Sequence, residues 1–198
     1  MNQIIDQDGI ANRTIEIGKQ EWMAENLNVS HYKNGDPIPQ VEDKEEWTNL
    51  KTGAWCYYEN SSKHGIIYGK LYNWYAINDS RGLSPEGWNI PSNVDWQQMI
   101  DYLGGEGVAG GKMKEKGTAH WISPNEGANN ISGFNGLPGG ARHSNGTCVY
   151  KGETGYFWSS SEAGNNKANY YILWNDDKNI SQGKFNFEFG FSIRCIKN

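Results

Sequence analysis

Near its carboxyl end the chain reads Gly190-Phe191-Ser192-Ile193-Arg194-Cys195-Ile196-Lys197, the segment that is most informative about its architecture. Two earlier segments have a similar character, Leu137-Pro138-Gly139-Gly140-Ala141-Arg142 and Gly155-Tyr156-Phe157-Trp158-Ser159-Ser160-Ser161. Together they combine glycines, aromatic residues and a polar Arg or Ser among apolar neighbours. This mixture is typical of tightly packed strands that are joined by specified turns.

The composition indicates what kind of core this chain can build. Only 36% of the 198 residues are hydrophobic, and nine Trp and eleven Tyr supply much of the apolar area. Large aromatic side chains and 25 glycines favour short strands connected by long, ordered loops. The length suits one sizeable core, and we find no internal repeat or linker, so a single domain over residues 1–198 is expected.

Charge and hydropathy exclude several classes of partner. The net charge is −5 and no stretch concentrates Lys or Arg, which argues against nucleic acid and anionic membranes. No run of apolar residues is long enough to span a bilayer, so no transmembrane segment is expected. The first residues, 1–6, lack the basic and apolar pattern of a signal peptide, so the protein is either cytoplasmic or has lost a leader.

The strands are predicted from turn signals and alternation. The dipeptide Asp8-Gly9 predicts a β-hairpin over residues 3–24, and polar residues 30–53 predict a long surface loop. Apolar and aromatic runs predict consecutive antiparallel strands, at residues 170–174, 185–189 and 191–196.

The helices are predicted from caps and periodicity. Ser92 is a natural N-cap before an apolar stripe, so a helix is expected over residues 92–103, with a weaker one over about 109–116. Leu71, Trp74 and Tyr75 have helical spacing and predict a short buried helix.

An ordered set of motifs resembles the Fibrobacter succinogenes major paralogous domain family, over about residues 10–197. The motifs that carry the resemblance are residues 20–28 (QEWMAENLN), 68–76 (YGKLYNWYA), 84–92 (SPEGWNIPS), 101–105 (DYLGG), 109–114 (AGGKMK), 132–140 (SGFNGLPGG), 157–162 (FWSSSE) and the Ser192-Ile193-Arg194-Cys195 tail. The resemblance implies an α+β fold similar to that of C-type lectins, with two main helices and a curled antiparallel sheet. It also implies a bacterial protein that is secreted or at the cell surface, and it implies no particular reaction.

Two positions depart from the family pattern. Ser84 stands where the family usually has Cys, and Asn89 stands where it usually has His. If the family Cys bonds the C-terminal Cys, then Cys195 has no partner here, and the missing His removes a possible catalytic or metal-binding position. The other two cysteines are Cys56 and Cys148; one disulfide at most can form, and spacing does not reveal its pairing.

The triplet Trp174-Asn175-Asp176 matches the calcium-binding triplet of C-type lectins. Asn175 and Asp176 offer the hard oxygen ligands that calcium prefers, so they are the candidate metal ligands and calcium the candidate cofactor. The companion segment of such lectins is absent, and residues 123–126 (Ser-Pro-Asn-Glu) are its nearest counterpart. The alternative is a core tryptophan followed by a plain hairpin turn.

Other candidates are weighed against structural roles. Arg142 and His143, with Cys148 or Glu153, could form a nucleophile and its base, as in an enzyme related to formylglycine-generating enzymes. Trp47 and Trp121 lie in polar segments and are the better candidates for stacking platforms, although burial is the favoured interpretation of both. His31, His64 and His120 have no paired spacing, and we interpret them as surface or satisfied loop histidines. Arg194 is expected to face inward or along the sheet edge and to pair with a carboxylate or with carbonyls, in a structural role.

These observations predict a non-enzymatic binding module that recognises a glycan or a protein. Its ligand face is expected within residues 140–186, where Asn165, Asn166 and the 175–179 turn offer donors and acceptors at short reach. The candidate ligand-binding residues are therefore Trp174, Asn175, Asp176, Asn165, Asn166, Arg142, His143 and Trp121. The alternatives are a structural or adhesin assembly domain and the enzyme described above.

Overall fold

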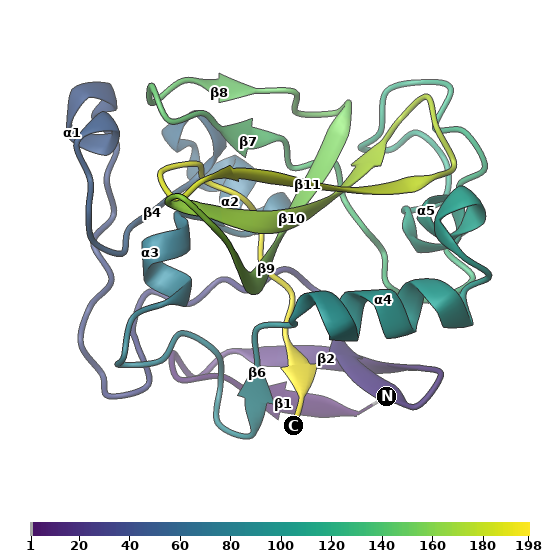
Figure 1. Cartoon of the computed structure of the whole chain (residues 1–198), viewed down its shortest axis with the longest axis horizontal. Helices are drawn as coiled ribbons and strands as arrows, with labels where there is room; N and C mark the ends of the chain where they lie inside the picture. Colours follow the sequence, from purple (N-terminus) through teal and green to yellow (C-terminus); the bar gives the residue numbers. More distant parts are fainter. Residues whose placement is uncertain (1) are drawn as a thin grey trace.

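The computed structural model describes residues 2–198, in which two antiparallel sheets organise the chain (Figure 1). The larger sheet contains, in spatial order, β1 (Gln3–Ile5), β2 (Ala11–Ile17), β3 (Gln20–Met23), β12 (Ile196–Lys197) and β6 (Trp88–Asn89). The smaller, curled sheet contains β11 (Ile180–Asn186), β10 (Lys167–Trp174) and β9 (Thr154–Gly164). Two short pairs complete the strands: β4 (Trp55–Cys56) with β5 (Leu71–Tyr72), and β7 (Ala141–Arg142) with β8 (Cys148–Val149).

Residues 2–198 contain five α-helices and one 3₁₀ turn over Tyr58–Asn60. The helices are α1 (Lys44–Thr48), α2 (Ser62–Tyr68), α3 (Trp74–Ile77), α4 (Asn93–Tyr102) and α5 (Glu106–Met113). None of them combines the length and the apolar composition that crossing a bilayer requires. The mixed α+β class and the curled antiparallel sheet agree with the sequence-based expectation.

The helix α4 forms where the sequence predicts it. The Ser92 side chain accepts from Asp95 N and the Asp95 carboxylate accepts from Ser92 N, which is a complete capping box. The helix buries Trp96, Met99 and Ile100 on one face. The second predicted helix, at 109–116, is shifted: α5 begins at Glu106 and ends at Met113, because Lys114 is extended and fully buried.

The predicted helix through Leu71 and Tyr75 is corrected. Leu71 and Tyr72 pair with β4 as strand β5, and α3 begins only at Trp74. Asn73 separates the two elements because its side chain caps α3 by accepting from Ala76 N. The backbone of residues 71–72 is therefore extended, and helical spacing alone is an insufficient guide here.

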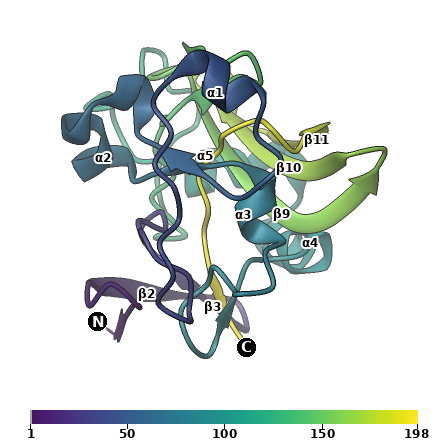
Figure 2. The same ribbon diagram turned by 90° about the vertical axis from the view of Figure 1, so that its left-hand side faces the viewer.

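The strands predicted at 185–189 and 191–196 are also wrong in their bounds. β11 ends at Asn186 and is followed by a turn at residues 187–188, where Phe189 N donates to Asn186 O at 3.1 Å. Residues 187–195, extended beyond that turn, connect the smaller sheet to the larger sheet (Figures 1 and 2). The segment makes single bridges to a different neighbour at each step, such as Phe191 with Tyr72 and Ser192 with Phe157. It forms no continuous ladder because it passes between elements instead of along one strand.

The same segment explains how the core is built from aromatic rings. Four apolar residues of this segment join the largest buried cluster: Phe187, Phe189, Phe191 and Ile193. A second cluster fills the space between α4, the smaller sheet and the larger sheet, where Trp96 stacks on Tyr171 at 4.7 Å between ring centroids. The sparse aliphatic content is thus compensated by tryptophan, tyrosine and phenylalanine, as expected.

Helix α5 depends on a close approach that only glycine permits. A Cβ at Gly110 would lie 2.1 Å from the backbone oxygen of Asn179, whereas a Cβ at Gly107 would be 3.8 Å from its nearest neighbour. We expect Gly110→Ala to lower the free energy of unfolding by about 1–3 kcal/mol through overpacking. The matched variant Gly107→Ala should raise the free energy of unfolding by about 0.5–1 kcal/mol, because alanine has a higher helix propensity than glycine. Urea unfolding of both variants checks this, and equal effects would contradict it.

Candidate functional site

The Trp174-Asn175-Asp176 turn is arranged around an ammonium group. Lys114 is fully buried, and its Nζ donates to the backbone oxygens of Trp174 and Asp177, both at 2.7 Å. The Asn175 amide donates to the carbonyls of Ile122 and Ser123, each at 3.3 Å. Burial lowers the pKa of Lys114 to about 8.

These residues do not fit a calcium ion. Calcium takes six to eight oxygen ligands, while here the turn carbonyls bind a lysine and the Asn175 amide is oriented as a donor. Residues 123–126, the nearest counterpart of the companion segment, also make protein contacts instead of offering a free ligand. The Asn125 amide donates to the carbonyls of Glu115 and Gly117. Within residues 2–198 no group of three or more His, Cys, Asp or Glu side chains could hold a metal.

Two of the predicted ligand residues are buried supports. Arg142 is 1% exposed, donates to the carbonyls of Val41, Glu42 and Asp43, and lies over the Trp47 ring. Trp121 is 1% exposed and donates through its indole to Gly136 O at 3.0 Å. The favoured interpretation of Trp47 and Trp121 as buried residues is confirmed, and Trp121 is corrected as a ligand residue. Both indoles fill the core, because few aliphatic residues are available to do so.

The remaining predicted residues lie apart from one another. Asn165 and Asn166 form the tip of the β9–β10 hairpin, both with positive φ, at the opposite end of β10 from Trp174. The half-buried His143 packs its ring against Phe189, with 4.5 Å between ring centroids. The structure therefore does not bring the predicted ligand residues together into one site.

The cysteines do not form a catalytic pair. All three are free thiols, and Cys56 and Cys195 are buried. Burial raises the pKa of Cys56 to about 12 and also raises the pKa of Cys148, whose sulfur accepts from Glu59 N at 3.2 Å. A thiol with a raised pKa is a poor nucleophile at neutral pH.

Two histidines that are distant in sequence meet at one tyrosine. The Tyr68 ring lies 6.2 Å from His64 and 5.9 Å from His120, measured between centroids. His64 bonds Lys151 at 2.8 Å, and His120 bonds Glu115 at 2.9 Å. The other nitrogen of His64 bonds Tyr58 O at 3.0 Å, so both nitrogens of His64 and one nitrogen of His120 are satisfied. His120 lies in a loop as predicted, whereas His64 lies in α2.

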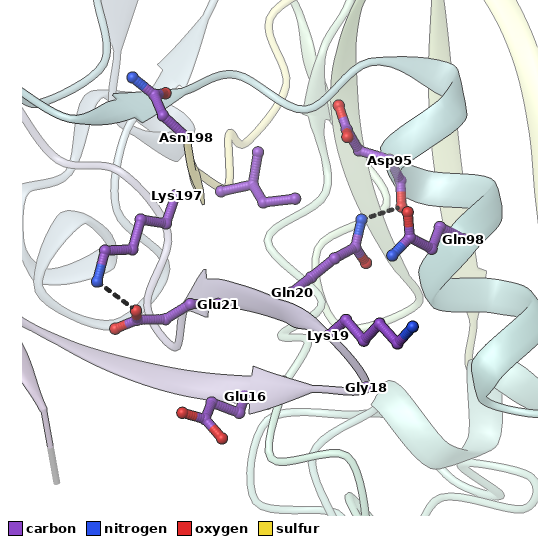
Figure 3. A pocket seen from close by; sticks show the side chains of 10 residues that line it. Glu16, Gly18, Lys19, Gln20, Glu21, Asp95, Gln98, Lys197 and Asn198 are labelled. Atoms are coloured by element: carbon purple, nitrogen blue, oxygen red, sulfur yellow. Dashed lines mark hydrogen bonds and ion pairs between the residues drawn. The ribbon is translucent and has the colours of Figure 1, made fainter.

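A polar groove lies where the β2–β3 turn, β12 and α4 converge, at the carboxyl end of the chain (Figures 1 and 3). Its volume is about 530 Å³, and an adjoining cavity of about 350 Å³ shares three of its residues. We call the two together the α4 groove. Its lining consists of Glu16, Ile17, Gly18, Lys19, Gln20, Glu21, Asp95, Gln98, Tyr102, Ile196, Lys197 and Asn198.

The floor of the α4 groove is held by hydrogen bonds. The Gln20 amide donates to Asp95 O at 3.0 Å and thereby joins β3 to α4 (Figure 3). The Glu21 carboxylate accepts from Lys197 and from Thr14, both at 2.7 Å. These two donors lower the pKa of Glu21, so its carboxylate stays ionised and fixed in place.

The rim of the α4 groove carries side chains that are free to bind. Glu16, Lys19, Gln98 and Asn198 are exposed, and none of these side chains has a hydrogen-bond partner within residues 2–198. Tyr102 is 67% exposed and stands beside them at the end of α4. A Cβ at Gly18 would lie 3.0 Å from the Tyr102 ring, so glycine lets the β2–β3 turn pack closely against it.

The α4 groove has no counterpart among the sites that the sequence predicts. Its residues come from three distant segments, and no local motif joins them. The one available signal was Tyr102, a large aromatic residue in the predicted helix but outside its apolar stripe of Trp96, Met99, Ile100 and Leu103.

Comparison with known proteins identifies one relationship. A family model described as the Fibrobacter succinogenes major domain matches residues 15–197, nearly the whole chain. Neither the curated proteins nor the solved structures contain a match.

Proposed function

This chain belongs to the Fibrobacter succinogenes major domain family, and from that starting point we propose that it is a non-enzymatic, glycan-binding module. The proposal includes a C-type lectin-like fold and a secreted or surface location, as the resemblance implies. The ligand would bind in the α4 groove instead of the 140–186 loops.

The observation that carries the proposal is the combination of Tyr102 with the polar rim. Sugars present apolar faces and many hydroxyls, which suit an exposed aromatic ring surrounded by amides and charged groups. Tyr102 offers such a ring, and Gln98, Lys19 and Glu16 surround it with both donors and acceptors. The ionised Glu21 adds a carboxylate that is already held in position.

Binding without catalysis agrees with the charge state of Glu21 in the groove. A glycosidase needs one carboxylic acid whose pKa is raised so that it can donate a proton. The pKa of Glu21 is lowered by Lys197 and Thr14, which makes it a poor donor. The raised pKa values of Cys56 and Cys148 argue likewise against the formylglycine-type alternative.

An array of glycans and polysaccharides, probed with the purified chain, tests the function. We expect hits that persist equally with added calcium and with a chelator, since Lys114 occupies the centre of the lectin-like turn. Hits that require calcium would move the site back to Trp174-Asn175-Asp176. Absence of hits in both conditions would reject glycan binding and leave protein binding or assembly.

Tyr102→Ala is expected to weaken glycan binding by about tenfold or more, because a central aromatic contact contributes roughly 1–2 kcal/mol or more. The side chain is 67% exposed, so we expect stability to change by less than about 0.5 kcal/mol. Isothermal titration against the strongest ligand from the array measures the effect. The matched control is Tyr150→Ala, which removes another exposed tyrosine outside the groove and should leave affinity unchanged. Equal losses in both variants would reject the groove as the site.

An assembly domain is the second candidate. Ile66 and Ile67 are neighbours on α2 and are 85% and 41% exposed, which is unusual for two large aliphatic side chains in succession. Sedimentation analysis distinguishes the two candidates. A stable oligomer that Ile66→Ser dissociates would favour assembly, and a monomer would favour the binding module.

A further inference from the structure

Lys70 is a buried lysine that meets a side-chain amide. It is 3% exposed, and its Nζ donates to the backbone oxygen of Asn28 and to Asn28 Oδ1, the latter at 3.1 Å. Aromatic rings cover its other sides, with Nζ 4.4 Å from the centroid of Trp55 and 5.6 Å from that of Tyr57. The ammonium group is thus shielded from water beside the carboxamide carbon of Asn28.

The two segments that carry these residues are clamped together on both sides of the contact. The Asn26 amide donates to Tyr68 O at 2.8 Å, and the Tyr72 hydroxyl donates to Val29 O at 2.7 Å. Both bonds are buried. Holding two reacting groups in one geometry replaces a bimolecular encounter with an intramolecular one, which greatly raises the rate of a reaction.

Other lysines that bond carbonyl groups lack this arrangement. Lys114 Nζ bonds only backbone oxygens, those of Trp174 and Asp177, and Lys112 Nζ bonds the backbone oxygen of Leu103. A peptide carbonyl has no ammonia to release without breaking the chain. Among the lysines of residues 2–198 for which hydrogen bonds are found, Lys70 is the one whose Nζ reaches a side-chain amide.

The surroundings also favour the uncharged amine, which is the nucleophilic form. Burial lowers the pKa of Lys70 to about 8, so roughly one tenth of the molecules hold a neutral amine at pH 7. The ion pairs of the described residues use other lysines, Lys51 and Lys197. Lys70 therefore has no bound carboxylate to hold it in the ammonium form.

We propose that Lys70 and Asn28 form an intramolecular isopeptide bond. The neutral Nζ attacks Cγ of Asn28, the new C–N bond forms, and the bond from Cγ to Nδ2 breaks. One proton passes from Nζ to Nδ2, so ammonia leaves and no oxidant or cofactor is consumed. Asn28 is exposed on its outer side, which gives the ammonia a path to solvent.

Asp8 is the carboxylate placed to carry that proton. The charges of Asp8 and Asp6 both act on Lys70, and the effect of Asp8 is the larger of the two. Hydrogen bonds to Ser30 N and to the His31 ring hold Asp8 against the segment that follows Asn28. Asp8 is assigned as a positioning and proton-transfer group, not as the nucleophile.

The bond would close a covalent loop from residue 28 to residue 70, independently of glycan binding. It would prevent α1 and the long loop before it from separating from the core when the protein is stretched or heated. A cross-link of this kind restricts the unfolded chain in the way that a disulfide does, without sensitivity to reductants.

Tandem mass spectrometry of tryptic digests of the intact, full-length chain tests the proposal after incubation at pH 9. We expect a branched peptide that joins the segments containing Asn28 and Lys70, with loss of one ammonia from the intact mass. The branched peptide is decisive, because asparagine followed by glycine can also lose ammonia, and this chain has such pairs at Asn34, Asn135 and Asn145.

Variants separate the chemistry from a merely structural contact. Asn28→Ala and Lys70→Arg should abolish the branched peptide, and Asp8→Asn should slow its formation while Lys70 and Asn28 remain. Circular dichroism shows whether each variant is folded. If a variant does not fold, the digest of the wild-type protein alone decides whether the isopeptide bond forms. Recovery of both wild-type segments as separate, unmodified peptides after the incubation would overturn the proposal.

Discussion

Arg194→Ala is expected to lower the free energy of unfolding by about 3–5 kcal/mol, enough to unfold a domain of ordinary stability. Arg194 is 1% exposed, and its guanidinium donates to Asn26 Oδ1 at 2.7 Å and to the backbone oxygens of Met23 and Phe134 at 3.0 and 2.7 Å. Alanine would leave these acceptors buried without a partner, and each such group costs about 1–3 kcal/mol.

Two further variants isolate the cause of this loss. Arg194→Lys retains a cation but loses the planar guanidinium group. Its free energy of unfolding should therefore lie between those of the wild type and of Arg194→Ala. Arg13→Ala removes an exposed arginine that pairs with Glu25, and such a pair contributes about 1 kcal/mol or less. Urea unfolding monitored by tryptophan fluorescence ranks the variants. Arg194→Ala and Arg13→Ala with the same midpoint would refute the assignment of Arg194 as a central support.

Trp158→Ala is expected to destabilise the protein by about 3–5 kcal/mol through the cavity that it leaves. Trp158 is fully buried in β9, its indole donates to Tyr72 O at 2.9 Å, and its ring lies 4.4 Å from Phe191. Its backbone N–H also donates to Ser192 O at 3.1 Å. One side chain therefore connects β9, β5 and the 187–195 segment.

Two further variants are compared with Trp158→Ala. One places a smaller aromatic residue at position 158, and the other changes an exposed residue. Trp158→Phe keeps an aromatic ring at this position, so it should lower the free energy of unfolding by less than Trp158→Ala does. Val94→Ala alters an exposed residue of α4 and should change the unfolding free energy by no more than about 0.5 kcal/mol. Thermal unfolding followed by circular dichroism measures all three. A Trp158→Ala midpoint within the range of Val94→Ala would contradict the packing described above.

The candidate site illustrates the limit of reasoning from local sequence. The triplet Trp174-Asn175-Asp176 matches a calcium motif in its letters, yet Lys114, sixty positions earlier, supplies the positive charge at its centre. Trp121 lies in a polar segment and Arg142 carries a charge, yet both are 1% exposed. Ligand geometry and burial depend on residues that are far away in the chain, and a short motif contains neither.

Several features follow from the amino-acid sequence alone, because their causes are local. The capping box of Ser92 and Asp95 lies within one turn of α4, and the β1–β2 hairpin follows from the turn dipeptide Asp8-Gly9. The family and the mixed α+β class follow from motifs read in order. The tertiary structure alone reveals the α4 groove, the burial of Arg142 and the contact of Lys70 with Asn28. Each joins segments that no periodicity relates, so long-range packing, and not local propensity, places them together.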